Sequence, residues 1–502
     1  MPGQHIIAFD AGGTAIKAAL YDERGFERAV AAVGMAPLHP APGCLERDPD
    51  AMWAAVCEVT RSVLSTAGVA PSSIAAVGLT GYGNGLFLVD RDGRPVRNAI
   101  LSPDLRAQAI VARWRAEGAE ARSVELTYNS EFPGKPLPLI AWLDAHEPES
   151  LRRADRALFC KDYLRFRLTG EIGLEVSDMS SAALTDLALR RWTPAALVPF
   201  GLERHARLFG EGVEPLTIVG AITGKAAAET GLRAGTPVSA GYADGPSMAL
   251  GLGATDESLI SVIAGTWSLN QLATRTPVKD GSVSGVIAGP RAGEFVLVDG
   301  SPTSASAFEW FVDSVLRRAA GDRSRDALFD LCNREVTQTR AEGDAPYFLP
   351  YLNGRLDQPE ARACFIGLAS WHGLPEMVRA LYEGVAFEHR GHIDRLLKGR
   401  EQPRAARFAG GAARSGRWLD IFASAIELPL ELSDATELGA LGAAIIAAVG
   451  VGIHPDLDTA VAAMTRVARR IEPDRELSGA LAARRKVFEA LRDQLSAAWG
   501  SS

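Results

Sequence analysis

Short apolar runs separated by glycine-rich turns dominate the start of the chain. Residues 6–9 form one apolar run and residues 15–21 a second, with a turn of Asp, Gly and Thr at residues 10–14 between them. This pattern predicts a hairpin, because short hydrophobic runs bounded by turn residues are typical of strands. A third apolar run over residues 26–33 predicts a further strand.

A helical period follows this hairpin region. Four apolar residues recur at spacings of four, three and four: Met52, Val56, Val59 and Val63. This spacing predicts an amphipathic helix. Two later apolar runs predict strands over residues 74–79 and 86–89. Alternation of strands and helices favours an α/β class.

A second cycle of the same pattern begins near residue 255. Strands are predicted over residues 258–263 and 268–273, separated by a Gly-Thr turn at residues 264–266. Residues 295–298 predict another strand and residues 306–318 an amphipathic helix. Because both halves open with strand, Gly/Thr turn and strand, the sequence indicates two related domains.

The two halves join where glycines cluster, between residues 245 and 256. We expect an N-terminal domain over residues 1–247 and a C-terminal domain over residues 248–502. A length of 502 residues also favours at least two domains.

Composition and charge narrow the class of protein. Hydrophobic residues make up 47% of the chain and charged residues 23%, which predicts a folded protein with a large core. The net charge of −8 gives no electrostatic reason to expect nucleic acid or an anionic membrane as partner, so we expect neither. The apolar stretch at residues 438–453 is short and rich in Ala and Gly, and it predicts a buried helix. Five scattered cysteines predict reduced thiols in a cytoplasmic protein.

The turn at residues 10–14 has residue types suited to phosphate. Gly12 and Gly13 allow the backbone to approach phosphate oxygens closely, and the Thr14 hydroxyl adds a donor. Asp10 could hold a hydrated Mg²⁺ that bridges two phosphates. An ordinary β-turn is the alternative, but the Gly-Thr turn of the second half strengthens the phosphate interpretation.

Four motifs, in this order, resemble those of the FGGY carbohydrate kinases of the sugar kinase, Hsp70 and actin superfamily. Asp10-Ala11-Gly12-Gly13-Thr14 resembles the first phosphate motif, and Ala264-Gly265-Thr266 resembles the second. Phe408-Ala409-Gly410-Gly411-Ala412-Ala413-Arg414-Ser415 is similar to the adenosine motif, and Glu437-Leu438-Gly439-Ala440 to the segment after it. The resemblance covers nearly the whole chain. It implies an α/β fold of two actin-like (ribonuclease H-like) domains facing a central cleft, with ATP and Mg²⁺ as cofactors.

The resemblance also implies which residues bind the nucleotide. The expected cofactor-binding residues are Gly12, Gly13, Thr14, Lys17, Gly265, Thr266, Gly410, Gly411, Ala412, Arg414 and Ser415. Gly410 and Gly411 follow a short predicted strand and would let adenine pack on bare backbone. From the pattern alone, a helix-capping turn is the alternative at these two glycines.

A base is needed near the hydroxyl that attacks the γ-phosphate. Asp244 follows the apolar segment 237–240 and lies among small residues. An Asp beside Gly is usually a turn residue, but this position matches the Gly-x-x-Asp motif that carries the catalytic base in the FGGY family. We therefore expect Asp244 to be the base and, with Asp10, to lie at the metal.

Polar loops at strand ends are expected to bind the sugar. Residues 80–84 and 102–106 lie where the family has its substrate contacts, and their polar side chains could bind vicinal hydroxyls. The expected substrate residues are Tyr82, Gly83, Asn84, Asp104, Asp244 and Trp267. For Trp267, a place in the core is the alternative.

Local differences from common subfamilies bear on the substrate. Gly83-Asn84 replaces the Met-His pair of D-xylulose kinases and the Arg-Glu pair of glycerol kinases, and Gly245 follows the base where Asn is frequent. Strings at residues 265–270, 301–305 and 361–368 resemble the L-xylulose kinase branch instead.

We therefore expect ATP-dependent phosphorylation of a small ketose or polyol, foremost a pentulose such as L-xylulose or D-xylulose. The alternatives are an erythritol or other polyol kinase, and an actin-like ATPase that switches on a protein partner. A homodimer is expected from the family's habit.

One further pattern concerns the second half. His389 and His392 have a spacing compatible with a metal site on a helix. The family has an ordinary amphipathic helix there, which is the interpretation we favour.

Overall fold

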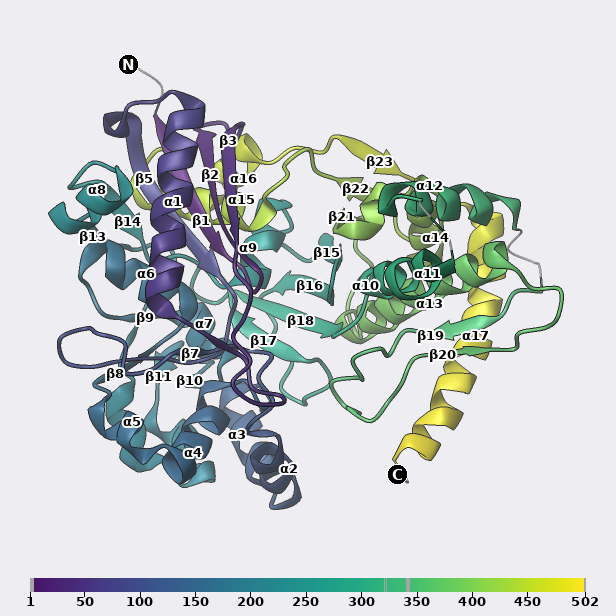
Figure 1. Ribbon diagram of the computed structural model, residues 1–502, viewed down its shortest axis with the longest axis horizontal. Helices are drawn as coiled ribbons and strands as arrows, with labels where there is room; N and C mark the ends of the chain where they lie inside the picture. The colour runs from purple at the N-terminus through teal and green to yellow at the C-terminus, as the bar shows by residue number, and fades with distance from the viewer. Residues whose placement is uncertain (1–3, 320, 322, 340–343, 501–502) are drawn as a thin grey trace. The chain divides into compact units, whose positions relative to one another are not determined.

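The structure is a computed structural model that describes residues 4–319, 321, 323–339 and 344–500. The chain clusters into two compact units, each assembled from three segments (Figure 1). Unit 1 contains the chain up to Gly253 together with Ala273–Leu297 and Ala435–Arg466. Unit 2 contains Ala254–Leu272, Val298–Asp434 and the chain from Val467 onward. The domain boundary between residues 247 and 248 stays a prediction.

Unit 1 is built on a six-stranded sheet with the order β13-β14-β5-β1-β2-β3. Its strands are β1 (His5–Ala11), β2 (Ala15–Asp22), β3 (Glu27–Gly34), β5 (Ile74–Gly81), β13 (Ile218–Ala221) and β14 (Pro237–Ser239). β1 and β2 form the predicted antiparallel hairpin, and β1 pairs in parallel with β5. The glycine-rich turn of residues 10–14 therefore lies at the carboxyl end of β1, beside the end of β5.

Unit 2 repeats this arrangement in the strand order β16-β15-β21-β22-β23, part of a seven-stranded sheet. The strands of that sheet are β15 (Leu259–Ala264), β16 (Ser268–Thr274), β17 (Gly285–Ala288), β18 (Phe295–Ser301), β21 (Ala405–Ala409), β22 (Leu430–Leu432) and β23 (Arg469–Ile471). β15 and β16 are antiparallel, as are β22 and β23, whereas β15-β21 and β21-β22 are parallel pairs. The order and direction match β2-β1-β5-β14-β13, which confirms the predicted internal repeat.

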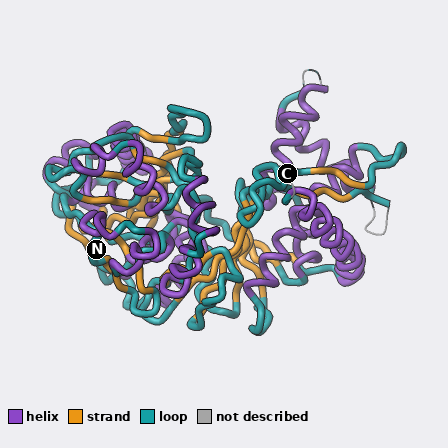
Figure 2. The backbone as a smooth tube through the Cα atoms, turned by 90° about the horizontal axis from the view of Figure 1, so that it is seen from below, coloured by secondary structure: helices purple, strands orange, loops and turns teal. Residues whose placement is uncertain are grey.

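Helices cover both faces of the first sheet. Alternate residues of β1 point to opposite faces. Ile7 and Phe9 pack in one core cluster with α1 (Pro49–Ala67), whereas Ile6 and Ala8 pack in another with α15 (Leu438–Gly450). Figures 1 and 2 show strands enclosed by helices in this part of the chain.

Small residues explain how closely α15 approaches its neighbours. A Cβ atom on Gly442 would overlap the carbonyl oxygen of Ser247 on α9 (Asp244–Gly251), and one on Gly78 of β5 would overlap that of Ala443. The helix is buried on nearly every side, as predicted from its Ala and Gly content. Among the helices that the structure describes, none has the length and apolar character to cross a membrane.

The remaining helices belong to one unit or the other. In unit 1 they are α2 (Gln108–Ala116), α3 (Ala119–Thr127), α4 (Pro136–His146), α5 (Pro148–Arg153), α6 (Cys160–Thr169), α7 (Val176–Ser181), α8 (Gly224–Thr230) and α16 (Leu457–Met464). In unit 2 they are α10 (Ser306–Trp310), α11 (Arg317–Ala319), α12 (Arg325–Glu335), α13 (Leu374–Leu396), α14 (Gly416–Ile426) and α17 (Arg475–Trp499). The single helix predicted over residues 306–318 needs correction, because a π-helical turn at Phe311–Leu316 separates α10 from α11.

Short strand pairs complete the fold. They are β4 (Glu46–Arg47) with β7 (Ala99–Ile100), β6 (Phe87–Val89) with β8 (Arg156–Leu158), β9 (Leu174–Glu175) with β12 (Gly212–Val213), β10 (Thr185–Asp186) with β11 (Arg191–Trp192), and β19 (Tyr347–Leu349) with β20 (Cys364–Ile366).

Candidate active site

The turn between β1 and β2 presents its backbone to solvent. Gly13 and Thr14 are exposed, and Gly12 is half-buried. The Arg47 guanidinium stabilises this turn by donating hydrogen bonds to the carbonyl oxygens of Gly12 at 3.2 Å and Gly13 at 2.6 Å. Arg47 is buried and lies 35 and 34 positions away from these glycines, and no local pattern had indicated its role.

Two carboxylates meet at the carboxyl end of β1. Burial, together with the nearby charge of Asp244, raises the pKa of Asp10 to about 7, although Lys17 opposes the shift. Burial also raises the pKa of Asp244, again against Lys17. The structure thus brings together the predicted metal ligand, the predicted base and a predicted nucleotide-binding lysine.

Lys17 is itself held by an ion pair. Its Nζ lies 2.8 Å from Glu437 Oε2, and the Tyr21 hydroxyl donates to the carbonyl oxygen of Glu437 at 3.0 Å. Glu437 directly precedes α15, so this pair fixes the start of that helix beside Asp10. A Cβ atom on Gly439 would lie 2.6 Å from Asp10 Oδ2, so any larger residue there would displace this carboxylate.

Tight backbone contacts position the loop that carries Asp244. Gly241 has a φ of 87°, and a Cβ atom on it would overlap the carbonyl oxygen of Leu79. The Thr80 hydroxyl donates to the carbonyl oxygen of Tyr242 at 2.8 Å. α9 begins at Asp244, so the carboxylate lies at a helix N-terminus, where a negative charge is favoured.

A fully buried charge cluster supports the same loop. Its members are Lys161, Asp162, Arg165, Glu175 and Asp178. Arg165 also donates to the carbonyl oxygen of Ala240 at 2.9 Å. Ser177, which donates to Glu175, accepts the backbone N–H of Ala243 at 3.0 Å. Removing one member of such a cluster would leave an uncompensated buried charge, so the cluster makes the loop rigid. The sequence had not indicated it.

The predicted sugar-binding residues of unit 1 differ in their burial and in the hydrogen bonds they already make. Tyr82 is buried, and its backbone N–H donates to Ala11 at the phosphate turn at 3.0 Å. Asn84 adopts a positive φ of 61°, and its Nδ2 donates to Ser181 at 3.4 Å. Its buried Oδ1 accepts no hydrogen bond from the described residues. Gly83 lies against Asp178, because a Cβ atom on Gly83 would be 3.3 Å from Asp178 Oδ1.

Asp104 is more constrained. It is fully buried, Oδ2 accepts the backbone N–H of Leu45 at 2.7 Å, and both oxygens accept from the Arg106 guanidinium at 2.9 Å. Any sugar hydroxyl that binds Asp104 would have to share an oxygen with these donors.

Unit 2 brings the second phosphate turn and the adenosine motif together. Gly410 has a φ of 105°, and a Cβ atom on it would lie 2.8 Å from the backbone nitrogen of Gly265 and overlap the carbonyl oxygen of Ala264. Gly410 and Gly411 are exposed, as the packing of a flat ring on bare backbone requires. Gly265 donates across its turn to the carbonyl oxygen of Trp267 at 3.2 Å, and Thr266 is exposed.

The other residues of unit 2 that were predicted to bind nucleotide or substrate are partly buried and partly exposed. Ala412 is buried, and Ser415 caps α14 by accepting the backbone N–H of Trp418 at 3.2 Å, whereas Arg414 is exposed. Trp267 is 47% exposed, so it is not a core residue.

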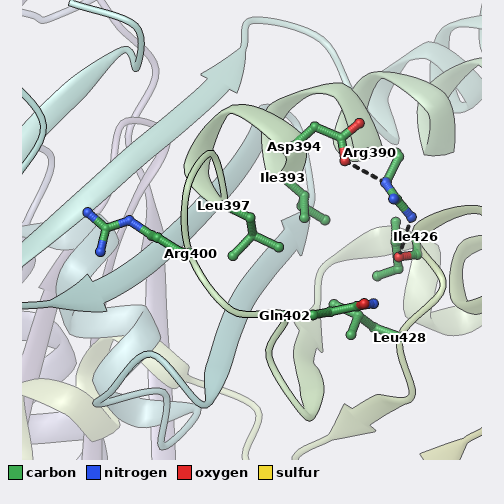
Figure 3. Close-up of a pocket in the computed structure, with 8 residues that line it drawn as sticks. All are labelled: Arg390, Ile393, Asp394, Leu397, Arg400, Gln402, Ile426 and Leu428. Atoms are coloured by element: carbon green, nitrogen blue, oxygen red, sulfur yellow. Dashed lines mark hydrogen bonds and ion pairs between the residues drawn. The ribbon is translucent and has the colours of Figure 1, made fainter. Parts of the chain in front are cut away.

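A pocket of about 220 Å³ lies elsewhere in unit 2 (Figure 3). Its charged groups are already paired: Arg390 with Asp394 and Glu427, and Arg400 with Glu257. None of its lining residues belongs to the predicted site, and we assign it no role.

Both halves of the chain match one family. Residues 5–251 match the N-terminal domain of the FGGY family of carbohydrate kinases, and residues 260–451 match its C-terminal domain. The L-xylulose/3-keto-L-gulonate kinase of Escherichia coli (strain K12) is 34% identical over 473 residues, covering 94% of this chain and 93% of that protein. A probable L-xylulose kinase of Pasteurella multocida (strain Pm70) is 31% identical, with 98% and 99% covered.

Solved structures agree with these matches. The xylulose kinase from Rhodospirillum rubrum has a TM-score of 0.88 at 26% identity, covering 99% of this chain and 100% of that chain. This likeness, together with the repeated sheet order, confirms the predicted actin-like α/β fold. The chain therefore belongs to the FGGY family of carbohydrate kinases, ATP-dependent transferases that phosphorylate small sugars or polyols.

Proposed function

We propose that this kinase transfers the γ-phosphoryl group of ATP to a hydroxyl of a pentulose, with L-xylulose as the first candidate. The observation that carries the proposal is the meeting of Asp10, Asp244 and Lys17 at the end of β1. The choice of sugar is supported by the name of the Escherichia coli relative and by the strings at residues 265–270 and 301–305.

Asp244 is the base in this proposal. Its carboxylate accepts the proton of the sugar hydroxyl as the hydroxyl oxygen forms its bond to the γ-phosphorus and the bond to ADP breaks. Burial raises the pKa of Asp244, which makes the carboxylate a better proton acceptor, while the positive charge of Lys17 opposes this rise. Phosphoryl transfer otherwise requires positioning and charge stabilisation.

The two glycine turns would hold the phosphates. Arg47 occupies the carbonyl oxygens of Gly12 and Gly13, which fixes the peptide planes of the first turn and supports an anion-binding role for its exposed face. Lys17 supplies positive charge beside it. In unit 2, we assign Gly265 and Thr266 to phosphate, and the segment from Gly410 to Ser415 to adenosine.

The residues present fit a hydrated Mg²⁺. Asp10 and Asp244 lie near each other in a partly buried place, so their negative charges repel when both are ionised. A bound cation would offset this repulsion. Among the described residues there is no group of three or more His, Cys, Asp or Glu that could hold a metal ion. Mg²⁺ usually keeps several waters and takes one or two carboxylates plus phosphate oxygens, which suits this pair. When bound, it would neutralise charge on the transferring phosphoryl group.

The sugar contacts remain proposals at the level of single residues. Asn84 has the strongest support, because its Oδ1 is an available buried acceptor in the described part of the chain. Tyr82, Gly83 and Trp267 would shape the site, and Asp104 would contribute only by sharing its oxygens with Arg106 and Leu45.

A coupled ATP assay over pentuloses, hexuloses and polyols tests this function. The highest kcat/KM on L-xylulose is expected. The highest value on erythritol would make the chain a polyol kinase instead. ATP consumption that ignores every sugar and rises with a protein partner would overturn the proposal.

We also propose a cytoplasmic homodimer. The five free cysteines suit a reducing compartment, which also supplies ATP. The dimer rests on the habit of the family, and light scattering of the purified chain tests it.

A further inference from the structure

The His389-x-x-His392 pattern on α13 belongs to a buried polar cluster of unit 2. The cluster, called here the His389 network, consists of Ser268, Asn270, Ser304, His389 and His392, all of them buried. Three of its members lie in the strings that resemble the L-xylulose kinase branch, yet the proposed mechanism gives none of them a role.

The hydrogen bonds of His389 fix its tautomer. Nδ1 lies 2.8 Å from Asn270 Oδ1, which can only accept, so Nδ1 carries the proton. Nε2 is then the acceptor for the Ser304 hydroxyl, 2.8 Å away. Burial and the neighbouring His392 lower the pKa of His389 well below its usual value, which keeps the ring neutral. His392 lies one helical turn after His389. Its Nδ1 is 3.0 Å from the Ser268 hydroxyl and 3.1 Å from Asn270 Nδ2.

Ser304 connects this network to the second phosphate turn. Its backbone N–H donates to the carbonyl oxygen of Thr266 at 3.1 Å, while its hydroxyl donates to His389. Ser306 gives Thr266 a second support, because its hydroxyl donates to the same carbonyl oxygen at 2.7 Å. A single residue, Ser304, therefore contacts the turn with its backbone and the histidine with its side chain.

We propose that His389, acting through Ser304, is a positioning residue that holds the Gly265–Thr266 turn in the conformation that ATP requires. The inference rests on the proposed function, since it takes this turn to bind phosphate. It explains why the hydrogen bonds of His389 and of His392 are made with Ser and Asn side chains. Rigid support of this kind matters because phosphate-binding groups must be held within a fraction of an ångström.

Two histidine variants separate the contacts. His389→Asn keeps a donor near the Nδ1 position for Asn270 but has no acceptor that reaches Ser304. His389→Gln extends an amide oxygen toward the Nε2 position and can still accept from Ser304. Ser304→Ala removes only the hydroxyl, so of these variants it should disturb folding least.

Steady-state kinetics of the full chain with ATP and its best sugar would test the inference. We expect Ser304→Ala and His389→Asn each to raise the KM for ATP about tenfold, the scale of one buried hydrogen bond. The KM for the sugar should change less than twofold, and His389→Gln should restore most of the ATP affinity. The double variant Ser304→Ala/His389→Asn should be no worse than either single variant, because both remove the same contact.

The opposite results would overturn the inference. These are an unchanged KM for ATP in Ser304→Ala, additive effects in the double variant, or a parallel loss for both substrates that follows the fall in Tm. A wild-type chain without sugar-dependent ATP consumption would instead overturn the proposed function, so the two failures are distinguishable.

Discussion

Lys17 Nζ lies 2.8 Å from Glu437 Oε2, an ion pair between residues 420 positions apart in the chain. The pair joins β2, near the start of unit 1, to the first residues of the segment that returns to this unit after most of unit 2. It also places beside Asp10 a positive charge that lowers its pKa and a negative charge that raises it, and the positive charge lowers the pKa of Asp244 as well.

Removing the charge of Lys17 and removing that of Glu437 should move the acid limb of the pH profile in opposite directions. Lys17 lowers the pKa of Asp10 and of Asp244, so Lys17→Met should raise both and move the acid limb of kcat/KM to higher pH. Glu437 raises the pKa of Asp10, so Glu437→Gln should move the limb to lower pH. Activity needs both carboxyl groups to be ionised, so a higher pKa moves the acid limb to higher pH and a lower pKa moves it to lower pH. Profiles for the sugar at saturating ATP measure the shifts, and a shift of both variants in one direction would contradict the assignment.

Asp244→Asn should lower kcat by two orders of magnitude or more, because general base catalysis is typically worth 10² to 10⁴. The amide keeps the shape of the side chain but cannot accept the proton. ADP binding, measured by calorimetry, should stay close to that of the wild type. Turnover near the wild-type value would remove Asp244 from the mechanism.

Gly410→Ala should weaken ATP binding at least tenfold. At a φ of 105°, an added Cβ would overlap the carbonyl oxygen of Ala264 and push the adenosine motif from the second phosphate turn. Gly416→Ala is the matched control, since a Cβ atom there meets nothing within 4 Å. KM for ATP in both variants measures the difference, and equal values would show that the close approach at Gly410 is unimportant for nucleotide.

Gly442→Ala should destabilise the protein, although alanine is normally better than glycine in a helix by about 1 kcal/mol. The added Cβ would overlap Ser247 on α9, and overpacking of this kind costs about 1–3 kcal/mol. Gly479→Ala on α17 meets nothing within 4 Å and should be neutral or stabilising. Thermal unfolding of both variants provides the comparison. A Gly442→Ala variant as stable as Gly479→Ala would contradict the packing of α15 against α9.

Local patterns in the sequence were sufficient to predict the hairpins, their glycine turns and the repetition of this hairpin in the second half of the chain. The strand over residues 6–9, the helix around Val56 and the buried helix in the apolar stretch 438–453 were all confirmed, because a period of two or 3.6 and a turn residue are properties of neighbouring positions. The family also followed from motifs in order along the chain.

Only the tertiary structure decided what supports those motifs. The contacts of Arg47 with the Gly12 and Gly13 carbonyl oxygens, of Glu437 with Lys17 and of His389 with Ser304 each join groups that are 34 to 420 positions apart. No local pattern marks such partners, since they are selected by how sheets and helices pack. The phosphate turns could therefore be predicted from the sequence, whereas the charges and hydrogen bonds that hold them in place depend on the folded chain.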